Sequence, residues 1–408
     1  MTETLPLQPW MSSPDAKAVF AALEQAGGPD AARFVGGCVR DAIVGKPVSD
    51  VDIATPILPE QVMEALRANG LGAHPTGIEH GTVTATAKGR PFEITTLRRD
   101  VETDGRRAVV AFTTDWAEDA QRRDFRLNAL YLDRAGRLYD PTGGGLDDAK
   151  AGRIIFVGDP EQRLREDHLR NLRFFRFHAW YGRSAPDPAA LAACAKLKDG
   201  VVTLSGERVS KELLKLLAAP DPRPSVRLMD EAGVLGKVLP QAHDLARFEA
   251  LAEFETDPEL RLAALLPDDA LTVAAAAKRL RLSNAQRRRL LCAVSDEVAV
   301  GGDMTEAALR RAIYLLGAGT VRDRLQLARA ADPSHDAPWP ALTTVTETWD
   351  RPSLPLGGDD VKAAGVPEGP RLGRFLGLVE AWWIDNDFAP DRAALLARLQ
   401  RAVETGEA

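Results

Sequence analysis

The chain has 408 residues, of which 45% are hydrophobic and 27% are charged, and its formal net charge at pH 7 is -7. This length exceeds one domain of ordinary size, so two to four domains are expected, each able to bury its own core. The acidic balance excludes a protein whose whole surface is basic for nucleic-acid binding, although a local basic cleft is compatible with it. The three widely spaced cysteines predict neither a disulfide framework nor a zinc site and indicate a reducing compartment.

Targeting signals are not evident in the sequence. No run of about 18 apolar residues without charge occurs, so no membrane-spanning segment is expected. The segment 1–17 carries an early acid and no apolar core, unlike a signal peptide. We therefore expect a cytoplasmic protein.

The first 155 residues mix glycine turns with short β-rich runs, which predicts an α/β or α+β region. Strands are expected at 33–37, 51–55, 82–89, 91–98, 128–133 and 153–158. Helical patterns lie between them, at 59–69 and 115–123. After residue 160 the β signal fades, and helix-forming residues interrupted by proline and glycine predict an array of helices.

Two glycines, Gly36 and Gly37, end the first β-rich run, directly after its apolar residues, and precede a short helix that carries Arg40. Glycines in such a turn let a phosphate approach the backbone, and a guanidinium adds a charged donor. The spacing matches neither the dinucleotide fingerprint nor the Walker lysine motif, so neither a Rossmann nor a P-loop site is indicated. Gly36, Gly37 and Arg40 are therefore candidate phosphate-binding residues of another kind of site.

An acidic triplet opens the second expected strand. Side chains alternate along a strand, so Asp50 and Asp52 would project together while Val51 and Ile53 face the core. Paired carboxylates repel unless a cation lies between them, and Mg²⁺ is commonly held by one or two carboxylates plus phosphate oxygens. An isolated triplet of this kind is also typical of a helix cap or a solvated turn, and both alternatives stay open at this point.

The stretch 36–55, GGCVRDAIVGKPVSDVDIAT, resembles the signature of the class II tRNA nucleotidyltransferase and bacterial poly(A) polymerase family. Three further segments resemble later motifs of that family, in the same order: RRDFRLNAL at 122–130, EDHLRNLRFFRF at 166–177 and LSGERVSKELLKLL at 204–217. The resemblance implies an α+β fold, in which a small mixed-sheet polymerase-β-like nucleotidyltransferase head precedes an all-helical neck, body and tail. The expected bounds are 1–155 for the head, 156–245 for a neck with nucleotide-recognition and RNA-binding elements, and 246–408 for a tRNA-binding body and tail.

The activity implied by the resemblance is that of a template-independent RNA nucleotidyltransferase. Such an enzyme would add the CCA 3′ terminus to tRNA from CTP and ATP and release pyrophosphate. A poly(A) polymerase and a partial CC- or A-adding enzyme are alternatives within the same chemistry, and a catalytically silent RNA-binding module is an alternative of another class. The expected partners are the acceptor arm at the tRNA 3′ end, CTP and ATP, with no membrane and no obligate protein partner.

The first two motifs carry the expected catalytic roles. By resemblance, Asp50 and Asp52 are the catalytic residues and hold two Mg²⁺ ions. Glu93 is a candidate third metal-binding carboxylate, for which an edge-strand acid is the alternative. In the second motif, Arg123 is assigned to phosphate or ribose and Asp124 to a sugar hydroxyl. The alternative for these two residues is a salt bridge ahead of a core strand.

Asn128, the last polar residue of the second motif, is expected to support the turn that carries Arg123 and Asp124. The charged stretch 98–107 is expected to be a loop, and it resembles the family's flexible loop, which helps the site change from C to A. Its presence favours the full CCA activity over CC addition alone.

The third motif is expected to select the base. A helix with 3.6 residues per turn would place four charged residues on one face: Arg163, Glu166, Arg170 and Arg173. Asp167 beside Arg170 would present an acceptor next to a donor, which matches the pairing edges of C and A but not of U and G. The alternative is a solvated face with i,i+4 ion pairs. The resemblance adds Arg173 and Arg176 as phosphate or base contacts and Glu166 as an orienting neighbour.

Two basic segments occur in the helical half, at 277–290 and 309–329. Each could follow a phosphate backbone, and each is also typical of an amphipathic surface helix. Aromatic residues are sparse near both, so recognition of backbone and shape fits better than readout of single-stranded bases.

Overall fold

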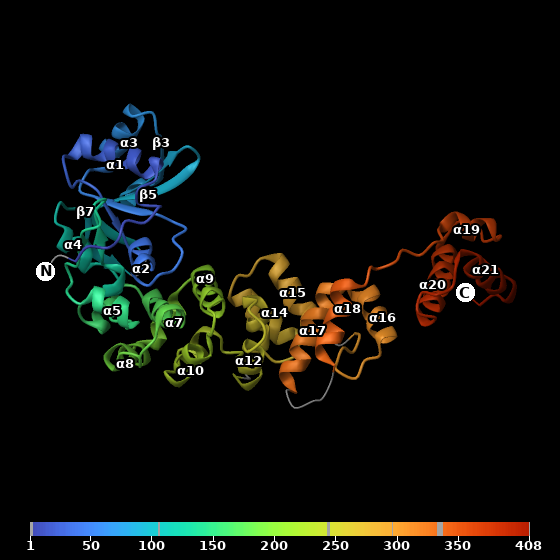
Figure 1. Cartoon of the computed structure of the whole chain (residues 1–408). Helices are drawn as coiled ribbons and strands as arrows, with labels where there is room; N and C mark the ends of the chain where they lie inside the picture. The colour runs from blue at the N-terminus through green and yellow to red at the C-terminus, as the bar shows by residue number, and fades with distance from the viewer. Residues whose placement is uncertain (1–2, 105–106, 243–244, 296, 333–337, 408) are drawn as a thin grey trace. The chain divides into compact units, whose positions relative to one another are not determined.

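A computed structural model describes residues 3–104, 107–242, 245–295, 297–332 and 338–407, without the side chains of 100–110. The chain divides into two compact units, Met1–Pro240 and Gln241–Ala408 (Figure 1). The expected boundary between head and neck at residue 155 falls inside the first unit and stays a prediction. Among the described residues, no helix is both long enough and apolar enough to span a membrane.

The first unit is built on a mixed sheet. Its strands are β1 (Arg33–Val35), β2 (Asp52–Thr55), β3 (Gly72–Gly77), β4 (Thr82–Ala87), β5 (Arg90–Thr96), β8 (Tyr131–Leu132) and β9 (Leu138–Tyr139). They lie in the order β3-β4-β5-β2-β1-β8-β9. Only the central β2–β5 pair is parallel, and the other neighbouring pairs are antiparallel. The predicted small mixed sheet is therefore confirmed.

The two faces of this sheet have different neighbours. Helices α1 (Pro14–Gly27) and α3 (Pro59–Ala68) contact each other and β4, and Phe20 of α1 packs on Phe34 of β1 with ring centroids 4.5 Å apart. Val35 points away from Phe34, into a second cluster with Tyr131 and with Ala120 of α4 (Trp116–Gln121). Because side chains alternate along β1 and β2, this second face is also the face of Asp52.

The stretch 98–107 is not a simple loop, contrary to expectation. β6 (Arg98–Asp104) and β7 (Arg107–Phe112) form an antiparallel pair that stands as a separate two-stranded sheet. The register shifts between Asp100 and Glu102, as at a β-bulge. Residues 105 and 106 lie outside the described part of the chain.

Two expected strands are shorter than predicted. In 128–133 only Tyr131–Leu132 is strand, because Asn128 ends a short 3-10 helix, η2 (Arg126–Asn128). In 153–158 only one isolated bridge forms, between Phe156 and Phe125. The rings of these two residues lie 4.8 Å apart in the core. Short apolar runs do not by themselves separate strands from buried loops.

The rest of the first unit is helical. Its helices are α2 (Gly37–Ile43), α5 (Gly145–Ala151), α6 (Pro160–Glu166), α7 (Leu169–Tyr181), α8 (Pro188–Lys196), α9 (Gly206–Leu217), α10 (Arg223–Glu231) and α11 (Leu235–Val238), with the 3-10 segments η1 (Ile78–His80) and η3 (Lys198–Thr203). Helix α7 contacts both α9 and α10. The third and fourth sequence motifs therefore lie against each other.

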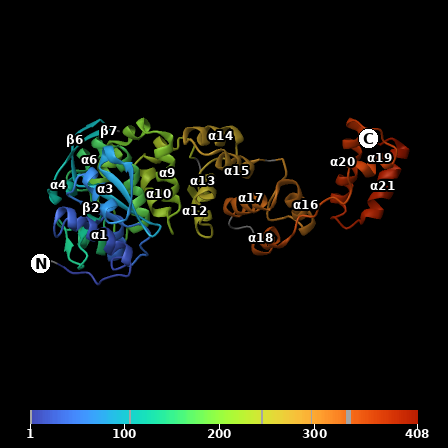
Figure 2. The ribbon, with the colours of Figure 1, turned by 90° about the horizontal axis from the view of Figure 1, so that it is seen from above.

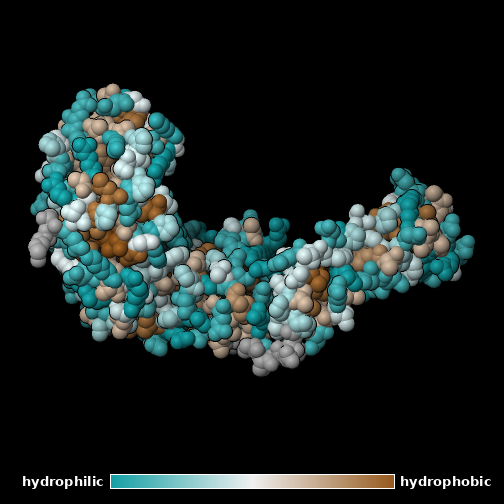
Figure 3. Space-filling model, in the orientation of Figure 1, coloured by the Kyte–Doolittle hydropathy of each residue, from teal (hydrophilic) through white to brown (hydrophobic). Residues whose placement is uncertain are grey.

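The second unit contains only helices and connecting segments in its described part (Figures 1 and 2). They are α12 (Leu245–Ala252), α13 (Pro258–Ala264), α14 (Ala270–Arg279), α15 (Asn284–Val294), α16 (Glu306–Leu316), α17 (Ala318–Ala331), α18 (Trp339–Thr348), α19 (Gly358–Ala363), α20 (Pro370–Asp385) and α21 (Arg392–Thr405). Leucine- and valine-rich faces bury one cluster among α16, α17 and α18 and another around Phe375 and Trp383 of α20. Hydrophilic residues cover most of the visible face of this unit (Figure 3). The predicted helical array is confirmed.

Candidate active site

The two acids of the triplet lie where β2 begins. Asp50 is exposed and Asp52 is partly buried, whereas Val51 and Ile53 are both buried. This is the alternation expected of a strand, and it keeps both carboxylates out of the core. The parallel register places Glu93 of β5 directly opposite Asp52. Three carboxylates thus lie at one end of the β2–β5 pair.

The charges around Asp52 suit a cation. Burial raises the pKa of Asp52 to about 6, the negative charges of Glu93 and Asp50 add to the rise, and Arg123 opposes it. Within the described ranges, no three Asp, Glu, His or Cys side chains converge closely enough to hold an ion by themselves. Mg²⁺ commonly takes one or two carboxylates and completes its shell with water and phosphate oxygens. Asp50 and Asp52 therefore fit a divalent cation that is shared with a triphosphate.

Gly36 is the point at which the first and second motifs meet. It precedes α2 with φ of +71°, a conformation that glycine adopts without steric cost. A Cβ atom placed there would lie 3.6 Å from Nη1 of Arg123 and 4.0 Å from Oδ2 of Asp52. The bare backbone of Gly36, a guanidinium and a carboxylate therefore border the same small space, which suits an anion bound beside a metal.

Asp119, which was not singled out from the sequence, holds the two adjacent arginines that open the second motif. Its carboxylate accepts hydrogen bonds from Nε of Arg122 at 2.8 Å, Nη2 of Arg123 at 2.9 Å and the hydroxyl of Tyr131 at 2.7 Å. Burial alone would raise the pKa of Asp119, but the charges of Arg123 and Arg122 outweigh it and lower the pKa to about 2. The i,i+3 and i,i+4 spacing on the expected helix 115–123 was the available sequence signal.

Asp124 pairs with the third motif and not with Arg123. Nε of Arg173 donates to its Oδ2 at 2.7 Å, and Nδ2 of Asn128 donates to its Oδ1 at 3.0 Å. The amide oxygen of Asn128 in turn accepts a hydrogen bond from Nη1 of Arg40 at 2.7 Å. Burial by itself would raise the pKa of Asp124, but Arg173 and these hydrogen bonds lower it to about 2. This network ties the first three motifs together, and Asn128 lies at its centre, between Asp124 and Arg40.

Arg40 is largely committed to contacts within the protein. Its side chain is buried, its Nε donates to Asp41 at 3.0 Å, and its Nη2 donates to the hydroxyl of Tyr181 at 2.7 Å. The guanidinium also lies 4.1 Å from the centroid of the Tyr181 ring. The structure therefore gives Arg40 a bracing role between α2 and α7, and its phosphate contact stays a prediction.

The fourth motif supplies a buried acid to the third. Nε of Arg176 donates to Oε2 of Glu212 at 2.5 Å, and Nη1 of Arg173 lies 3.9 Å from the other carboxylate oxygen. Glu212 is buried on α9, so the two arginines of α7 share one acid across the helix pair. The phosphate or base contacts expected of Arg173 and Arg176 stay predictions.

The expected continuous helix through the third motif is wrong. α6 ends at Glu166, Asp167 has an extended backbone with φ of -150° and ψ of 106°, and α7 begins at Leu169. The carboxylate of Asp167 accepts a hydrogen bond from the backbone N–H of Leu169 at 3.0 Å. Local bonding of this kind competes with helix continuation and begins a new helix instead.

Asp167 and Arg170 form ion pairs with other residues and not with each other. Asp167 pairs with Arg208 of α9 at 2.8 Å. Arg170 donates from Nη1 to Glu166 at 2.6 Å and from Nη2 to the carbonyl oxygen of Arg122 at 3.0 Å. The i,i+4 ion pair of the alternative is therefore present, and the sequence analysis missed Arg208. Base selection by Asp167 and Arg170 stays a prediction.

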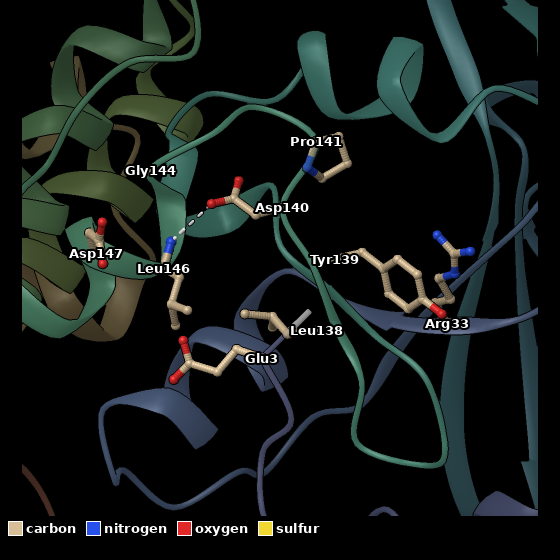
Figure 4. A pocket seen from close by; sticks show the side chains of 9 residues that line it. All are labelled: Glu3, Arg33, Leu138, Tyr139, Asp140, Pro141, Gly144, Leu146 and Asp147. Carbon is tan, nitrogen blue, oxygen red and sulfur yellow. Dashed lines mark hydrogen bonds between the residues drawn. The ribbon is translucent and has the colours of Figure 1, made fainter. Parts of the chain in front are cut away.

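A pocket of about 630 Å³ lies elsewhere on the first unit, and none of the predicted site residues lines it (Figure 4). The guanidinium of Arg33 lies over the rings of Tyr139 and Trp116, 3.7 Å and 4.1 Å from their centroids. The pocket also carries Asp140 and Asp147. It is distinct from the cluster around Gly36.

The two buried acids Asp119 and Asp124 are expected to make the stability of the fold sensitive to low pH. Their folded pKa values of about 2 lie below the ordinary value of 3.8. Each therefore stabilises the fold fully above about pH 4, and this contribution, on the order of 2 kcal/mol per group, is lost as the pH falls toward 2. Urea unfolding at about pH 7, 4 and 2.5 should show a smaller acid loss in Asp119→Asn and Asp124→Asn than in the parent. Equal losses in parent and variants would contradict the assignment.

Comparisons with known proteins cover most of the chain. Residues 32–155 match the model of the poly A polymerase head domain, and residues 185–245 match that of the probable RNA and SrmB-binding site of polymerase A. The mitochondrial CCA tRNA nucleotidyltransferase 1 of Mus musculus is 32% identical over 384 residues, covering 90% of this chain and 86% of that protein. The CCA-adding enzyme of Levilactobacillus brevis is 32% identical over 402 residues, covering 94% of this chain and 96% of that enzyme.

Solved structures agree with these sequence relatives. The crystal structure of the Bacillus stearothermophilus CCA-adding enzyme in complex with CTP has a TM-score of 0.78 and 26% identity, and it covers 97% of this chain and 99% of that one. The similarity thus includes the helical unit as well as the sheet and its motifs. The expected α+β fold is confirmed, and the chain belongs to the family of CCA tRNA nucleotidyltransferases.

Proposed function

We propose that this protein adds the CCA 3′ terminus to tRNA from CTP and ATP, without a nucleic-acid template, and releases pyrophosphate. The observation that carries this proposal is the similarity to a CCA tRNA nucleotidyltransferase over 90% of the chain, which includes both compact units. A match confined to the head would support nucleotide transfer alone. The matched helical half supports tRNA as the acceptor. We also propose that the enzyme acts in the cytoplasm.

The catalytic roles follow from the cluster around Gly36. Asp50 and Asp52 would hold two Mg²⁺ ions, and Glu93 opposite Asp52 is the candidate third carboxylate. When bound, these ions would activate the tRNA 3′-hydroxyl and stabilise the charge of the triphosphate. Gly36 leaves room for the phosphates beside Arg123, whose guanidinium would contact phosphate or ribose. The backbone of Gly37 would complete the phosphate contacts.

The remaining motif residues would bind and orient the nucleotide. Asp119 fixes the direction of Arg123. The guanidinium is therefore already ordered before the triphosphate binds. Asp124 would contact the sugar hydroxyl from the network that already includes Arg173. Asp167 would accept a hydrogen bond from the exocyclic amine of C or A, with Arg170 as the neighbouring donor. Glu166, which pairs with Arg170 here, would orient that donor.

Asp167→Asn is expected to change nucleotide choice and not only rate. An amide offers a donor as well as an acceptor. The variant should therefore discriminate less strongly against UTP, whose pairing edge presents donor and acceptor in the reverse order to that of CTP. We expect the ratio of kcat/KM for CTP over UTP to fall at least about tenfold, which corresponds to about 1.4 kcal/mol. Asp187→Asn, at the N-cap of α8, is a control in the same unit. An unchanged C over U preference in both Asp167→Asn and Arg170→Lys would contradict the pairing model.

The product length of a tRNA extension assay tests the function. A tRNA that lacks its CCA end is incubated with CTP alone, ATP alone or both, and the products are sized on a sequencing gel. The proposed activity predicts two added residues with CTP and three with both nucleotides. Long products with ATP alone would indicate a poly(A) polymerase, and arrest after CC would indicate a partial enzyme. No extension by folded, RNA-binding protein would indicate a catalytically silent module.

A further inference from the structure

The two basic segments of the second unit differ in what their cations contact. In the segment 309–329, Arg310 pairs with Asp387 at 2.9 Å and Arg322 pairs with Glu255 at 2.9 Å. Arg324 donates to backbone carbonyls. These arginines therefore bind within the protein and have few donors left for a ligand.

The segment 277–290 keeps its cations on the surface. Lys278 near the end of α14 and Arg287 and Arg288 in the first half of α15 are exposed, and the described part of the chain offers their side chains no hydrogen-bond or ion-pair partner. Arg289, the next residue, is instead paired with Asp323 and Asp257 at 2.7 Å and 2.9 Å. The structural Arg289 thus directly follows two arginines whose side chains are unpaired in the described part of the chain.

The local charge is opposite to that of the whole protein. No Asp or Glu occurs between Asp269 and Asp296, whereas six Lys or Arg residues do, in a chain of net charge -7. Helices α14 and α15 contact each other across a short turn, so their cations flank the same corner. Hydrophilic surface covers this part of the unit (Figure 3). Exposed cations with no acid in the same stretch of sequence attract a polyanion.

The composition of this corner indicates which part of a polyanion it would contact. The stretch 270–295 contains no Phe, Trp or Tyr, so it has no ring on which an unpaired base could stack. Double-stranded RNA is recognised mainly by its shape and through its phosphates and 2′-hydroxyls. Lysine and arginine on a helical surface match such phosphates without reading sequence.

We infer that Lys278, Arg287 and Arg288, here called the α14–α15 surface, bind the phosphate backbone of a double-stranded arm of the tRNA. The inference rests on the proposed function, because it takes tRNA as the substrate. It assigns a tRNA contact to one of the two basic segments and denies it to the arginines of the other. The contact is electrostatic and independent of base sequence.

The full-length variant Lys278→Glu/Arg287→Glu/Arg288→Glu tests this surface. We expect its Kd for a tRNA lacking CCA to rise at least tenfold at about 0.1 M salt. The dependence of log Kd on log salt should become less steep by about 2, because each lost phosphate contact removes roughly 0.7–0.9 from the slope. The KM for tRNA should rise whereas the KM for CTP should not. The changes at Arg287 and Arg288 suit the dipole of α15, and Lys278→Glu opposes that of α14 only at an exposed position, where the effect is small. The variant should therefore keep its circular dichroism spectrum, with a Tm close to that of the parent.

The matched control carries the same change of charge on the first unit, as Lys17→Glu/Arg67→Glu/Lys88→Glu. These three cations are exposed on α1, on α3 and in the turn after β4, and their variant should bind tRNA within about twofold of the parent. Unchanged tRNA affinity and salt slope in the α14–α15 variant would overturn the inference. An equal loss in the control would overturn it too, because net charge alone would then explain the effect. A parent protein that binds tRNA but does not extend it would instead refute the proposed function.

Discussion

Asp52→Asn is expected to lower the rate of nucleotide addition by at least about 10³ while making the folded protein more stable at neutral pH. The loss of rate follows from removing the carboxylate that we propose as a metal ligand beside Gly36 and Arg123. The gain in stability follows from the environment of the carboxylate. Burial and the charges of Glu93 and Asp50 disfavour its ionised form in the folded state.

The sign of the stability effect is fixed by the direction of the pKa shift. The pKa of Asp52 rises from 3.8 to about 6 on folding, so the folded state binds the proton more tightly than the unfolded state. Above about pH 6 the ionised group therefore costs stability, on the order of 2 kcal/mol, and a neutral asparagine avoids this cost. Below about pH 4 the parent and Asp52→Asn should have similar free energies of unfolding.

The measurements are single-turnover addition of C to tRNA and urea unfolding in a metal-free buffer at about pH 7.5. Asp30→Asn is the control, since Asp30 is exposed on the same unit and asparagine accepts its positive φ of 67°. Asp50→Ala should also abolish addition, but without a gain in stability, because Asp50 is exposed. A rate within tenfold of the parent in either active-site variant would contradict the metal assignment.

Asp119→Ala is expected to reduce both stability and nucleotide binding. It removes the shared acceptor of Arg122, Arg123 and Tyr131 and leaves the partly buried guanidinium of Arg123 without its counter-charge. Breaking a buried ion pair in this way costs about 3–5 kcal/mol. Arg123 would also lose its fixed direction, so the KM for both CTP and ATP should rise severalfold.

Asp115→Ala on the same helix is the matched control for Asp119→Ala. Asp115 is the exposed N-cap of α4 and accepts a hydrogen bond from the N–H of Ala117 at 2.8 Å. Its loss should cost about 1 kcal/mol and leave nucleotide KM values unchanged. Chemical denaturation and steady-state kinetics of the two variants separate the roles. Equal stability of Asp119→Ala and Asp115→Ala would show that Asp119 does not hold the arginines.

Motifs that depend on neighbouring residues were predictable from the sequence. The alternation of Val51 and Ile53 with the two acids follows from the period of a strand, and the structure confirms it. The turn at Gly36 and the helical half were confirmed for similar reasons. Strand β3 was missed, since GAHPTG lacks the alternation and the β-branched residues of a typical strand.

Ion pairs between residues distant in the sequence were not predictable. A charge pattern shows which side chains can form ion pairs, but not which oppositely charged side chain the fold brings close to each of them. The sequence placed Asp167 near Arg170, but the break between α6 and α7 turns Asp167 toward Arg208. Asp124 forms an ion pair with Arg173, and Arg176 forms one with Glu212.

The sequence by itself therefore determined the family and the residue types of the candidate site, through the order of four motifs. Only the tertiary structure decided which charged side chains form ion pairs within the protein and which stay exposed and available to a ligand. The two basic segments illustrate the difference, since Arg322 is paired with Glu255 and Arg287 is exposed on α15. The physical reason is that local patterns depend on backbone periodicity, whereas the partner of a charged group depends on how the elements pack.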